Sequence, residues 1–330
     1  MSVEIIAEVA QGFEGSPDLA RLLVRAAGSA RADAVKFQLV YADEIAAPGY
    51  VHYDFFRKLE MPQEAWWRVA QDAKAAGLRL YFDVFGERSV SQAHMFKADG
   101  VKIHSTDFFH THLIRRALDL MPRVFVSLGG IAVEEVDAFL TTYRITPSSP
   151  VCLMYGFQAD PTPTEANHLN RLRTLTMRFP GYRFGFMDHA DGGTDEATTL
   201  ALLALPFGIE CLEKHISLDR SLQLEDHRSA LPPEQFLAFA QRVRRLEPAL
   251  GTDQLELTAM EREYRRNTMK AVVAIKPLKT GEVVTPTAIG LKRTAELPPA
   301  SSIYRLEDAV GRRVTAEIQV DQPLTTDVIA

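Results

Sequence analysis

The sequence predicts an α/β protein: a (β/α)8 TIM barrel over residues 1–250, followed by a small β-rich domain over residues 270–330. First, eight short apolar runs alternate with longer helical patterns through the first 250 residues. Such alternation is typical of a parallel sheet with helical crossovers, and eight strands in about 250 residues can close a barrel. Second, this rhythm stops after Lys270. The polar and basic segment 251–269 is predicted to be a linker with helical content.

The predicted strands are short runs bounded by turn-forming residues. In chain order they are EIIAEVA from Glu4, DAVKFQL from Asp33, LRLYFDVF from Leu78, GVKIHS from Gly100, RVFVSLG from Arg123, VCLMYG from Val151, YRFGFMDH from Tyr182 and IECLEKH from Ile209.

Helix boundaries between these runs are marked by capping residues. Ser16 is a suitable N-cap before Pro17, and Gly77 closes the helix that starts near Pro62. The last helix of the barrel ends near Leu250. A doubly wound open sheet is the structural alternative, but its glycine-rich first turn is matched poorly by AQGFEGS. The barrel is therefore favoured.

The region after Lys270 contains short β-like pieces rather than alternating strands and helices. Turn signals such as Pro277 and Gly281 separate AVVAIKPL, GEVVT, GLKRT and GRRVTAEI. These pieces predict a separate small domain.

The composition and net charge favour a globular protein and argue against a nucleic-acid-binding or membrane-spanning one. The chain is 46% hydrophobic and 24% charged, which is typical of a soluble globular protein. A net charge of −6 argues against a nucleic-acid partner, and no apolar run is long enough to span a bilayer. The N-terminus lacks the features of a signal peptide, so a cytoplasmic location is predicted. Cys152 and Cys211 are expected to be packed thiols rather than a disulfide.

Polar side chains gather where the predicted strands end. In a barrel of this type the active site lies at the C-terminal ends of the strands. The residues at these positions are Glu8, Lys36, Gln38, Asp83, Lys102, Ser105, Ser127, Gln158, Asp188, His189, Glu213 and His215.

The last strand shows which of these side chains point inward. Period-two alternation places Cys211, Glu213 and His215 on one face and Lys214 on the other. Glu213 and His215 are therefore predicted to enter the barrel mouth. A single histidine at a strand end is more often structural than a ligand, but the pair His189 and His215 leaves a divalent-metal site open.

The lysines at the strand ends also allow two interpretations. Lys36 and Lys102 would be solvent-reaching surface groups, or they would face an anionic ligand at the barrel mouth. Two lysines with nearby hydroxyls favour the second interpretation, with a phosphate or carboxylate as the ligand.

These motifs resemble the sialic acid synthase family, which includes N-acetylneuraminate synthases and spore coat polysaccharide synthases. IIAEVAQGFEGS resembles IAEIG-x-NH-x-GS, FMDHADG resembles the SDH motif, and CLEKHISLDRSLQLEDHRSAL resembles EKH-x-TLDR…PDH-x-ASL. The tail, with AVVAIKPLKTGEVVTPTAI and AEIQVDQPLTTD, resembles the antifreeze-like (SAF, β-clip) domain that ends these enzymes. The resemblance covers nearly the whole chain.

The resemblance implies an activity. Members of the family condense phosphoenolpyruvate with the open-chain aldehyde of an N-acyl hexosamine, giving a nine-carbon 2-keto acid and phosphate. It implies a divalent metal, typically Mn²⁺, held by His189 and His215. It also implies a domain-swapped homodimer in which Arg293 reaches the barrel mouth of a neighbouring subunit.

The resemblance also assigns roles to the strand-end residues. A carboxylate such as Glu8 or Glu213 would stabilise the positive charge that develops on the donor. Phosphoenolpyruvate would contact Lys36, Lys102, Ser105, Ser127 and Gln158, and the sugar would contact Glu8, Gln38, Asp226 and Arg293.

Several positions depart from the family pattern. The Asn-His pair after the first strand is Gly12–Phe13, a threonine of the third strand is Asp83, a tyrosine after the sixth strand is Asp160, and the serine of SDH is Met187. A carboxylate at position 83 is expected to repel a phosphate. Besides a synthase with a different acceptor, two functions therefore stay open: a carbohydrate- or anion-binding protein, and a Schiff-base aldolase using Lys36.

Overall fold

The computed structural model describes residues 2–330, which divide into two compact units. The first unit ends at Gly251 and the second spans Thr252–Ala330. Among residues 2–330, no helix combines the length and apolar character needed to cross a membrane.

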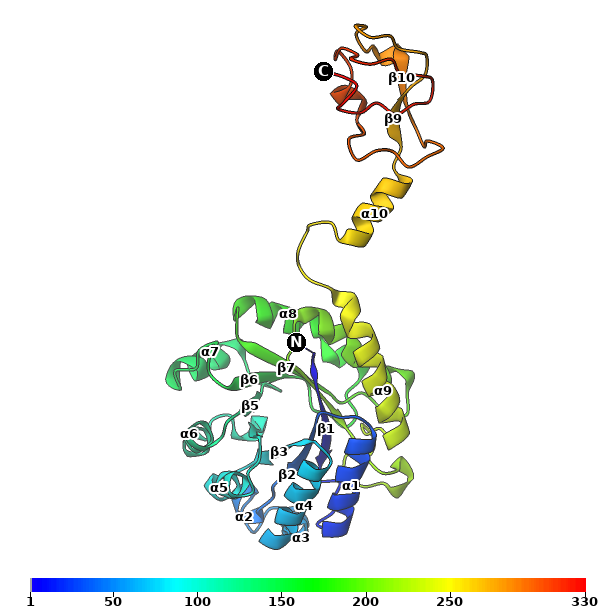
Figure 1. Ribbon diagram of the computed structural model, residues 1–330. Coiled ribbons are helices and arrows are strands. Elements are labelled where there is room, and N and C mark those ends of the chain that lie inside the picture. Colours follow the sequence, from blue (N-terminus) through cyan, green and yellow to red (C-terminus); the bar gives the residue numbers. More distant parts are fainter. Residues whose placement is uncertain (1) are drawn as a thin grey trace. The chain divides into compact units, whose positions relative to one another are not determined.

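The first unit is a closed barrel of eight parallel strands in sequential order (Figure 1). The barrel closes where β1 pairs with β8, with Glu8 opposite His215. The strands are β1 (Glu4–Ala10), β2 (Ala34–Gln38), β3 (Arg79–Val84), β4 (Gly100–Ile103), β5 (Val124–Ser127), β6 (Val151–Tyr155), β7 (Arg183–Asp188) and β8 (Cys211–His215). The predicted barrel is confirmed.

Helices surround the barrel and start and end where the sequence indicates. Ser16 caps α1, and its hydroxyl accepts a hydrogen bond from the Leu19 amide (3.3 Å). Gly77 follows α4 with a φ of 73°, the left-handed conformation that favours glycine at a helix end. The helices are α1 (Pro17–Ser29), α2 (Ala42–Ile45), α3 (Tyr53–Leu59), α4 (Gln63–Ala75), α5 (Glu87–Met95), α6 (Thr111–Leu120), α7 (Val133–Thr142), α8 (Leu169–Arg178) and α9 (Pro233–Leu246).

The connection between β7 and β8 differs from the other crossovers. Its main segment, Leu200–Phe207, is a 3₁₀ helix that contains Pro206. Pro206 stands one residue before the end of this segment, where its missing amide hydrogen and its ring disfavour continuation of the helix.

The core has an outer and an inner part. Between strands and helices, Phe13, Phe37, Trp66 and Phe82 form a buried aromatic cluster with ring centroids 5.2–6.0 Å apart. Inside the barrel, apolar and sulfur-containing side chains fill the middle layer: Ile6, Ala34, Tyr81, Phe125, Cys152, Met154, Met187 and Cys211. This layer closes the barrel below its mouth, so the polar residues above it lie on a packed floor.

The two cysteines are free and buried, as expected. Their sulfur atoms lie 3.8 Å apart across β7. Gly185 permits this approach, because a Cβ atom there would meet Cys211 Sγ and Met154 Sδ at 2.5 Å each.

The second unit begins with α10 (Ala259–Thr268) and continues as a small β-rich domain. Its regular sheet has two antiparallel strands, β9 (Ala271–Ala274) and β10 (Ile289–Lys292). Isolated bridges such as Leu278–Ile318 and Val314–Ile329 replace the longer strands that the β-like pieces suggested. A separate apolar core, including Val272, Leu278, Val314 and Leu324, holds this domain together.

Candidate active site

Five charged side chains meet inside the barrel mouth. Lys36 Nζ contacts Glu8, lies 2.7 Å from Asp83 Oδ1 and lies 2.9 Å from Glu213 Oε2. Lys102 Nζ lies 2.7 Å from Glu213 Oε1 and 3.3 Å from Asp83 Oδ2. All five side chains are at most 3% exposed, so the interpretation of the lysines as surface groups is wrong. We call Glu8, Lys36, Asp83, Lys102 and Glu213 the charged cluster.

Burial and charge set the protonation states of this cluster. Burial raises the pKa of Glu8 to about 8, although the Lys36 ammonium partly offsets it. Burial also opposes ionisation of Glu213, but Lys102 and Lys36 outweigh it and hold the pKa of Glu213 below its ordinary value. For Lys36, the neighbouring carboxylates overcome burial and raise its pKa well above the usual range. At neutral pH Glu8 is therefore protonated, whereas Glu213 is ionised and faces the Lys36 ammonium.

Three polar side chains, Ser105, Ser127 and Gln158, lie near the ends of the neighbouring strands β4, β5 and β6. The hydroxyls of Ser105 and Ser127 donate to Gln158 Oε1, at 3.2 and 3.3 Å. Met187 Sδ lies 3.8 Å from both Lys102 Nζ and Gln158 Nε2. The structure therefore brings together the lysine, serines and glutamine that the strand ends predicted. It also places Met187, a departure from the family pattern, against them.

His189 and His215 lie next to each other, with ring centroids 4.9 Å apart. Burial lowers the pKa of His189 to about 4 and the pKa of His215 well below its ordinary value. Both rings are therefore neutral at physiological pH, the form that binds a metal. The buried Nδ1 of His189 has no hydrogen-bond partner among residues 2–330.

These two rings fit a divalent metal that takes its remaining ligands from substrate or water. Residues 2–330 contain no group of three or more His, Cys, Asp or Glu side chains arranged to hold a metal. The chain would therefore supply two imidazoles and leave positions for exchangeable ligands.

The outward face of β8 carries a different ion pair. Lys214 Nζ lies 3.2 Å from Asp188 Oδ2, and both side chains are fully buried. The predicted alternation is confirmed, because Lys214 points away from the interior that Cys211 and Glu213 enter.

Asp226 is a further acidic residue, and it lies within range of the charges of Asp160, Lys102 and Asp83. Burial raises the pKa of Asp226 to about 7, and the nearby carboxylate of Asp160 adds to this effect. The Ser229 hydroxyl donates to Asp160 Oδ1 at 2.5 Å. Gln38, predicted to contact a sugar, accepts a hydrogen bond from Gln11 Nε2 at 2.6 Å.

Two positions that the sequence analysis associated with the sugar lie outside the barrel-mouth site. Phe13 is fully buried in the aromatic cluster and is not at the mouth surface. Arg293 belongs to the second unit, where its Nε donates to the Thr268 carbonyl at 3.0 Å.

Sequence reasoning missed His104 and the pairing of Asp83. Burial lowers the pKa of His104 to about 4, and charges of Asp83 and Lys102 act on it. His104 follows Lys102 by two residues, so period-two alternation could have placed it on the same side. The pairing of Asp83 with both lysines depends on three adjacent strands, and no local pattern reveals it.

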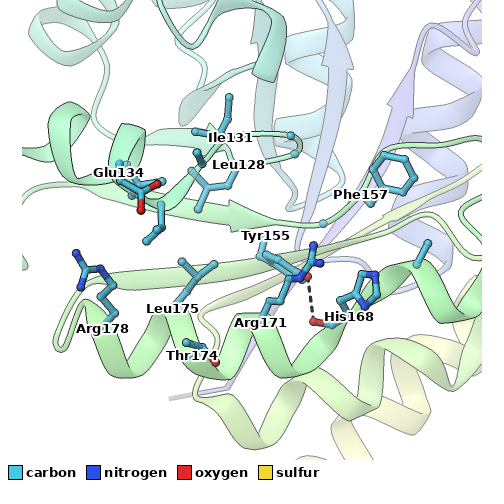
Figure 2. A pocket seen from close by; sticks show the side chains of 17 residues that line it. Leu128, Ile131, Glu134, Tyr155, Phe157, His168, Arg171, Thr174, Leu175 and Arg178 are labelled. Carbon is cyan, nitrogen blue, oxygen red and sulfur yellow. Dashed lines mark hydrogen bonds between the residues drawn. The ribbon is translucent and has the colours of Figure 1, made fainter.

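A groove of about 890 Å³ lies apart from the charged cluster, between α7 and α8 (Figure 2). Its floor includes Leu128 and Tyr155, which alternate with the inward-facing Ser127 and Met154 and therefore face outward from the barrel. The Tyr155 hydroxyl donates to the His168 carbonyl at 3.0 Å. None of the predicted site residues lines this groove, so it is not part of the candidate active site.

Comparisons with known proteins agree with this architecture. Spore coat polysaccharide biosynthesis protein SpsE of Bacillus subtilis is 25% identical over 320 residues, 90% of this chain and 85% of that protein. Human N-acetylneuraminate-9-phosphate synthase is 23% identical over 342 residues, 98% of this chain and 92% of that protein.

A solved structure shares the fold of the full chain. The crystal structure of a spore coat polysaccharide biosynthesis protein E from Chromobacterium violaceum superposes with a TM-score of 0.81 at 21% identity, covering 100% of both chains. The SAF domain model matches residues 270–330. The NeuB family model matches residues 23–255, and the chain therefore belongs to the NeuB family.

Proposed function

We propose that this protein is a nonulosonic acid synthase that condenses phosphoenolpyruvate with an N-acyl hexosamine or a related aldose, releasing phosphate. The observation that carries the proposal is the pair of buried lysines beside two neutral histidines in a NeuB family barrel. Relatives named as N-acetylneuraminate-9-phosphate, N,N'-diacetyllegionaminic acid and pseudaminic acid synthases support the reaction class.

Lys36 and Lys102 would bind the anionic donor. Phosphoenolpyruvate carries a phosphate and a carboxylate, and two ammonium groups in a water-poor site attract such charges strongly. Ser105 and Ser127 would turn their hydroxyls from Gln158 toward the phosphate oxygens. Asp83 competes with the donor for both lysines. We therefore expect the donor to bind more weakly than it would in a site without this carboxylate.

His189 and His215 would hold a divalent metal, for which we propose Mn²⁺. Such an ion supplies Lewis acidity toward the aldehyde oxygen of the acceptor. The buried, unpartnered Nδ1 of His189 and the neutral state of both rings support this assignment.

Glu213 and Glu8 would stabilise the positive charge that develops on the donor and exchange a proton with the reacting groups. Attack by C3 of phosphoenolpyruvate on the aldehyde leaves positive charge at C2, and the ionised Glu213 can stabilise it. Water then adds at C2, and the tetrahedral intermediate loses phosphate through cleavage of the C–O bond. Protonated Glu8, with a pKa of about 8, can exchange a proton in this step. Asp226 and Gln38 would contact the acceptor.

The active unit is proposed to be a domain-swapped homodimer in a cytoplasmic biosynthetic pathway. Arg293 of one subunit would reach the acceptor at the barrel mouth of its neighbour. The resemblance of residues 270–330 to SAF domains supports this role.

Phosphate release from phosphoenolpyruvate in the presence of Mn²⁺ tests the proposal, using a panel of N-acyl hexosamines and smaller aldoses. We expect release that depends on one sugar class and is abolished by a chelator and by His215→Ala. Metal binding by calorimetry gives a second readout, and we expect His215→Ala to lose it.

A second candidate function is binding of a carbohydrate or of another anion without catalysis, because the pairing of Asp83 with both lysines opposes the binding of phosphoenolpyruvate that the condensation requires. No phosphate release with any acceptor, together with no binding of phosphoenolpyruvate, would support it. The Schiff-base aldolase is disfavoured, because Lys36 is held as an ammonium ion by its carboxylate partners and its pKa is raised. Borohydride trapping of pyruvate on Lys36 would reverse that conclusion.

A further inference from the structure

A cavity of about 430 Å³ lies within the C-terminal unit, and its lining is rich in arginine. Arg265 comes from α10, while Arg305 and Arg312 flank the turn Leu306–Asp308. Asp308 also lines the cavity, so three positive charges face one negative charge. The volume is in the range of small-molecule sites.

The three guanidinium groups are available to a ligand. Within residues 2–330, no ion pair of 4 Å or less involves Arg265, Arg305 or Arg312. Arginine presents several N–H donors in a planar fork that matches phosphate oxygens. The ring of Tyr304 also lines the cavity, and its centroid lies 6.0 Å from the guanidinium carbon of Arg265.

Ser302 supplies an independent indication of a ligand. It lines the cavity, its side chain is 8% exposed, and its buried hydroxyl has no hydrogen-bond partner among the described residues. A buried hydroxyl without a partner is costly, so such groups are usually satisfied by an ion, water or ligand. The backbone around it is fixed, because Ser302 bridges to Thr325 and its amide donates to the Pro299 carbonyl (3.0 Å).

We propose that this cavity binds the phosphoryl group of a small phosphorylated molecule. The arginines would neutralise the dianion and Ser302 would donate to one of its oxygens. Met269, Ile303 and Tyr304 give the cavity an apolar edge for the carbon skeleton of the ligand. This site is built entirely from the second unit and is separate from the condensation chemistry proposed at the barrel mouth.

Methyl NMR of the full chain, labelled with ¹³C-methyl methionine, can test the proposal. Met269 lines the cavity, whereas Met187 contacts Lys102 and reports on the barrel mouth. Met269→Leu and Met187→Leu assign the two signals. We expect the Met269 signal to shift and saturate on titration with inorganic phosphate or glucose 6-phosphate. Tighter binding of glucose 6-phosphate would identify a sugar phosphate as the ligand, and equal binding would identify free phosphate.

Paired variants make the test specific. Arg305→Ala combined with Arg312→Ala should weaken the Met269 response at least about tenfold, because two charged hydrogen-bond donors are lost. Lys276→Ala combined with Lys279→Ala removes the same charge from exposed positions outside the cavity and should leave the response unchanged. Ser302→Ala should weaken binding by a few fold. The proposal is overturned if Met269 shows no saturable shift, or if the arginine variant responds like the wild type. A response of Met187 alone would support only the barrel-mouth site.

Discussion

At the scale of single residues, Asp83 decides the electrostatics of the candidate active site. Its two oxygens lie 2.7 Å from Lys36 and 3.3 Å from Lys102, so it bridges the two cations. The sequence suggested that a carboxylate here would repel a phosphate. The structure shows a further effect, because Asp83 also occupies the ammonium groups that a phosphate would use.

Replacing Asp83 by Asn should therefore strengthen binding of phosphoenolpyruvate. The amide keeps the shape of the side chain but removes one negative charge next to both lysines. We expect the KM for phosphoenolpyruvate to fall about tenfold, equivalent to about 1.4 kcal/mol. Steady-state phosphate release measures this value, and Asp119→Asn on the exposed face of α6 is the matched control. An unchanged or higher KM would show that Asp83 does not oppose the donor.

Asp226 should give the reaction a pH dependence near neutrality. Its pKa is raised to about 7 by burial and by Asp160, and the ionised form is the better acceptor of sugar hydroxyls. We expect kcat/KM for the acceptor to rise with pH through about 7. Asp160→Asn removes one cause of the raised pKa, so the inflection should move to lower pH. Asp54→Asn, an exposed change on α3, should leave the profile in place. An inflection that stays near 7 in Asp160→Asn would exclude this pair as its origin.

At the scale of elements, β8 shows how one strand serves both site and scaffold. Glu213 faces the barrel interior and pairs with both lysines, whereas Lys214 faces outward and pairs with Asp188. Neighbouring residues thus occupy opposite sides of the barrel wall because side chains alternate along a strand. All three ion pairs are buried: the two of Glu213 belong to the charged cluster, and the one of Lys214 belongs to the barrel wall.

Lys214→Met should destabilise the barrel. The change leaves the Asp188 carboxylate buried without its cation, which costs about 3 kcal/mol of unfolding free energy. Urea unfolding followed by tryptophan fluorescence measures this loss, since Trp66 and Trp67 both lie in the barrel unit. Lys74→Met on the exposed side of α4 should change the unfolding free energy by less than about 0.5 kcal/mol. If Lys214→Met lowers the unfolding free energy by less than about 1 kcal/mol, the Asp188 carboxylate does not depend on Lys214 for its stabilisation.

At the scale of the whole molecule, the chain combines a complete barrel with a second unit that has its own core. The charged cluster and the histidine pair lie wholly within the barrel unit. The residue assigned to the second unit, Arg293, is exposed and hydrogen-bonded within that unit. A contribution of Arg293 to catalysis would therefore be a property of the assembly.

Mixing two impaired variants should reveal such an assembly. Arg293→Ala should raise the acceptor KM, and His215→Ala should abolish turnover. If subunits exchange, a mixed dimer contains one intact site, formed by the barrel of the first variant and the Arg293 of the second. At low acceptor concentration we expect about a quarter of wild-type activity from an equal mixture, as random pairing in a two-subunit assembly gives. Activity that equals the average of the separate variants would refute a shared site.

The barrel, the separate C-terminal domain and the list of strand-end residues could all be predicted from the amino-acid sequence alone. Each of these depends on local information: the period of apolar residues, capping residues such as Ser16 and Gly77, and the alternation that turns Glu213 inward. Because the active site of such a barrel lies at the strand ends, a correct list of strands also gave a list of candidate site residues.

How those residues neutralise one another could not be predicted, because it depends on contacts that form when the chain folds. The contacts of Lys36 with Glu8, Asp83 and Glu213 join strands β1, β2, β3 and β8, which are far apart in the chain. The burial of these groups fixed the pKa of Glu8 near 8 and kept His189 and His215 neutral. Charge interactions depend on distances of a few ångströms and on exclusion of water. Neither quantity is encoded in the local pattern around any one of these residues.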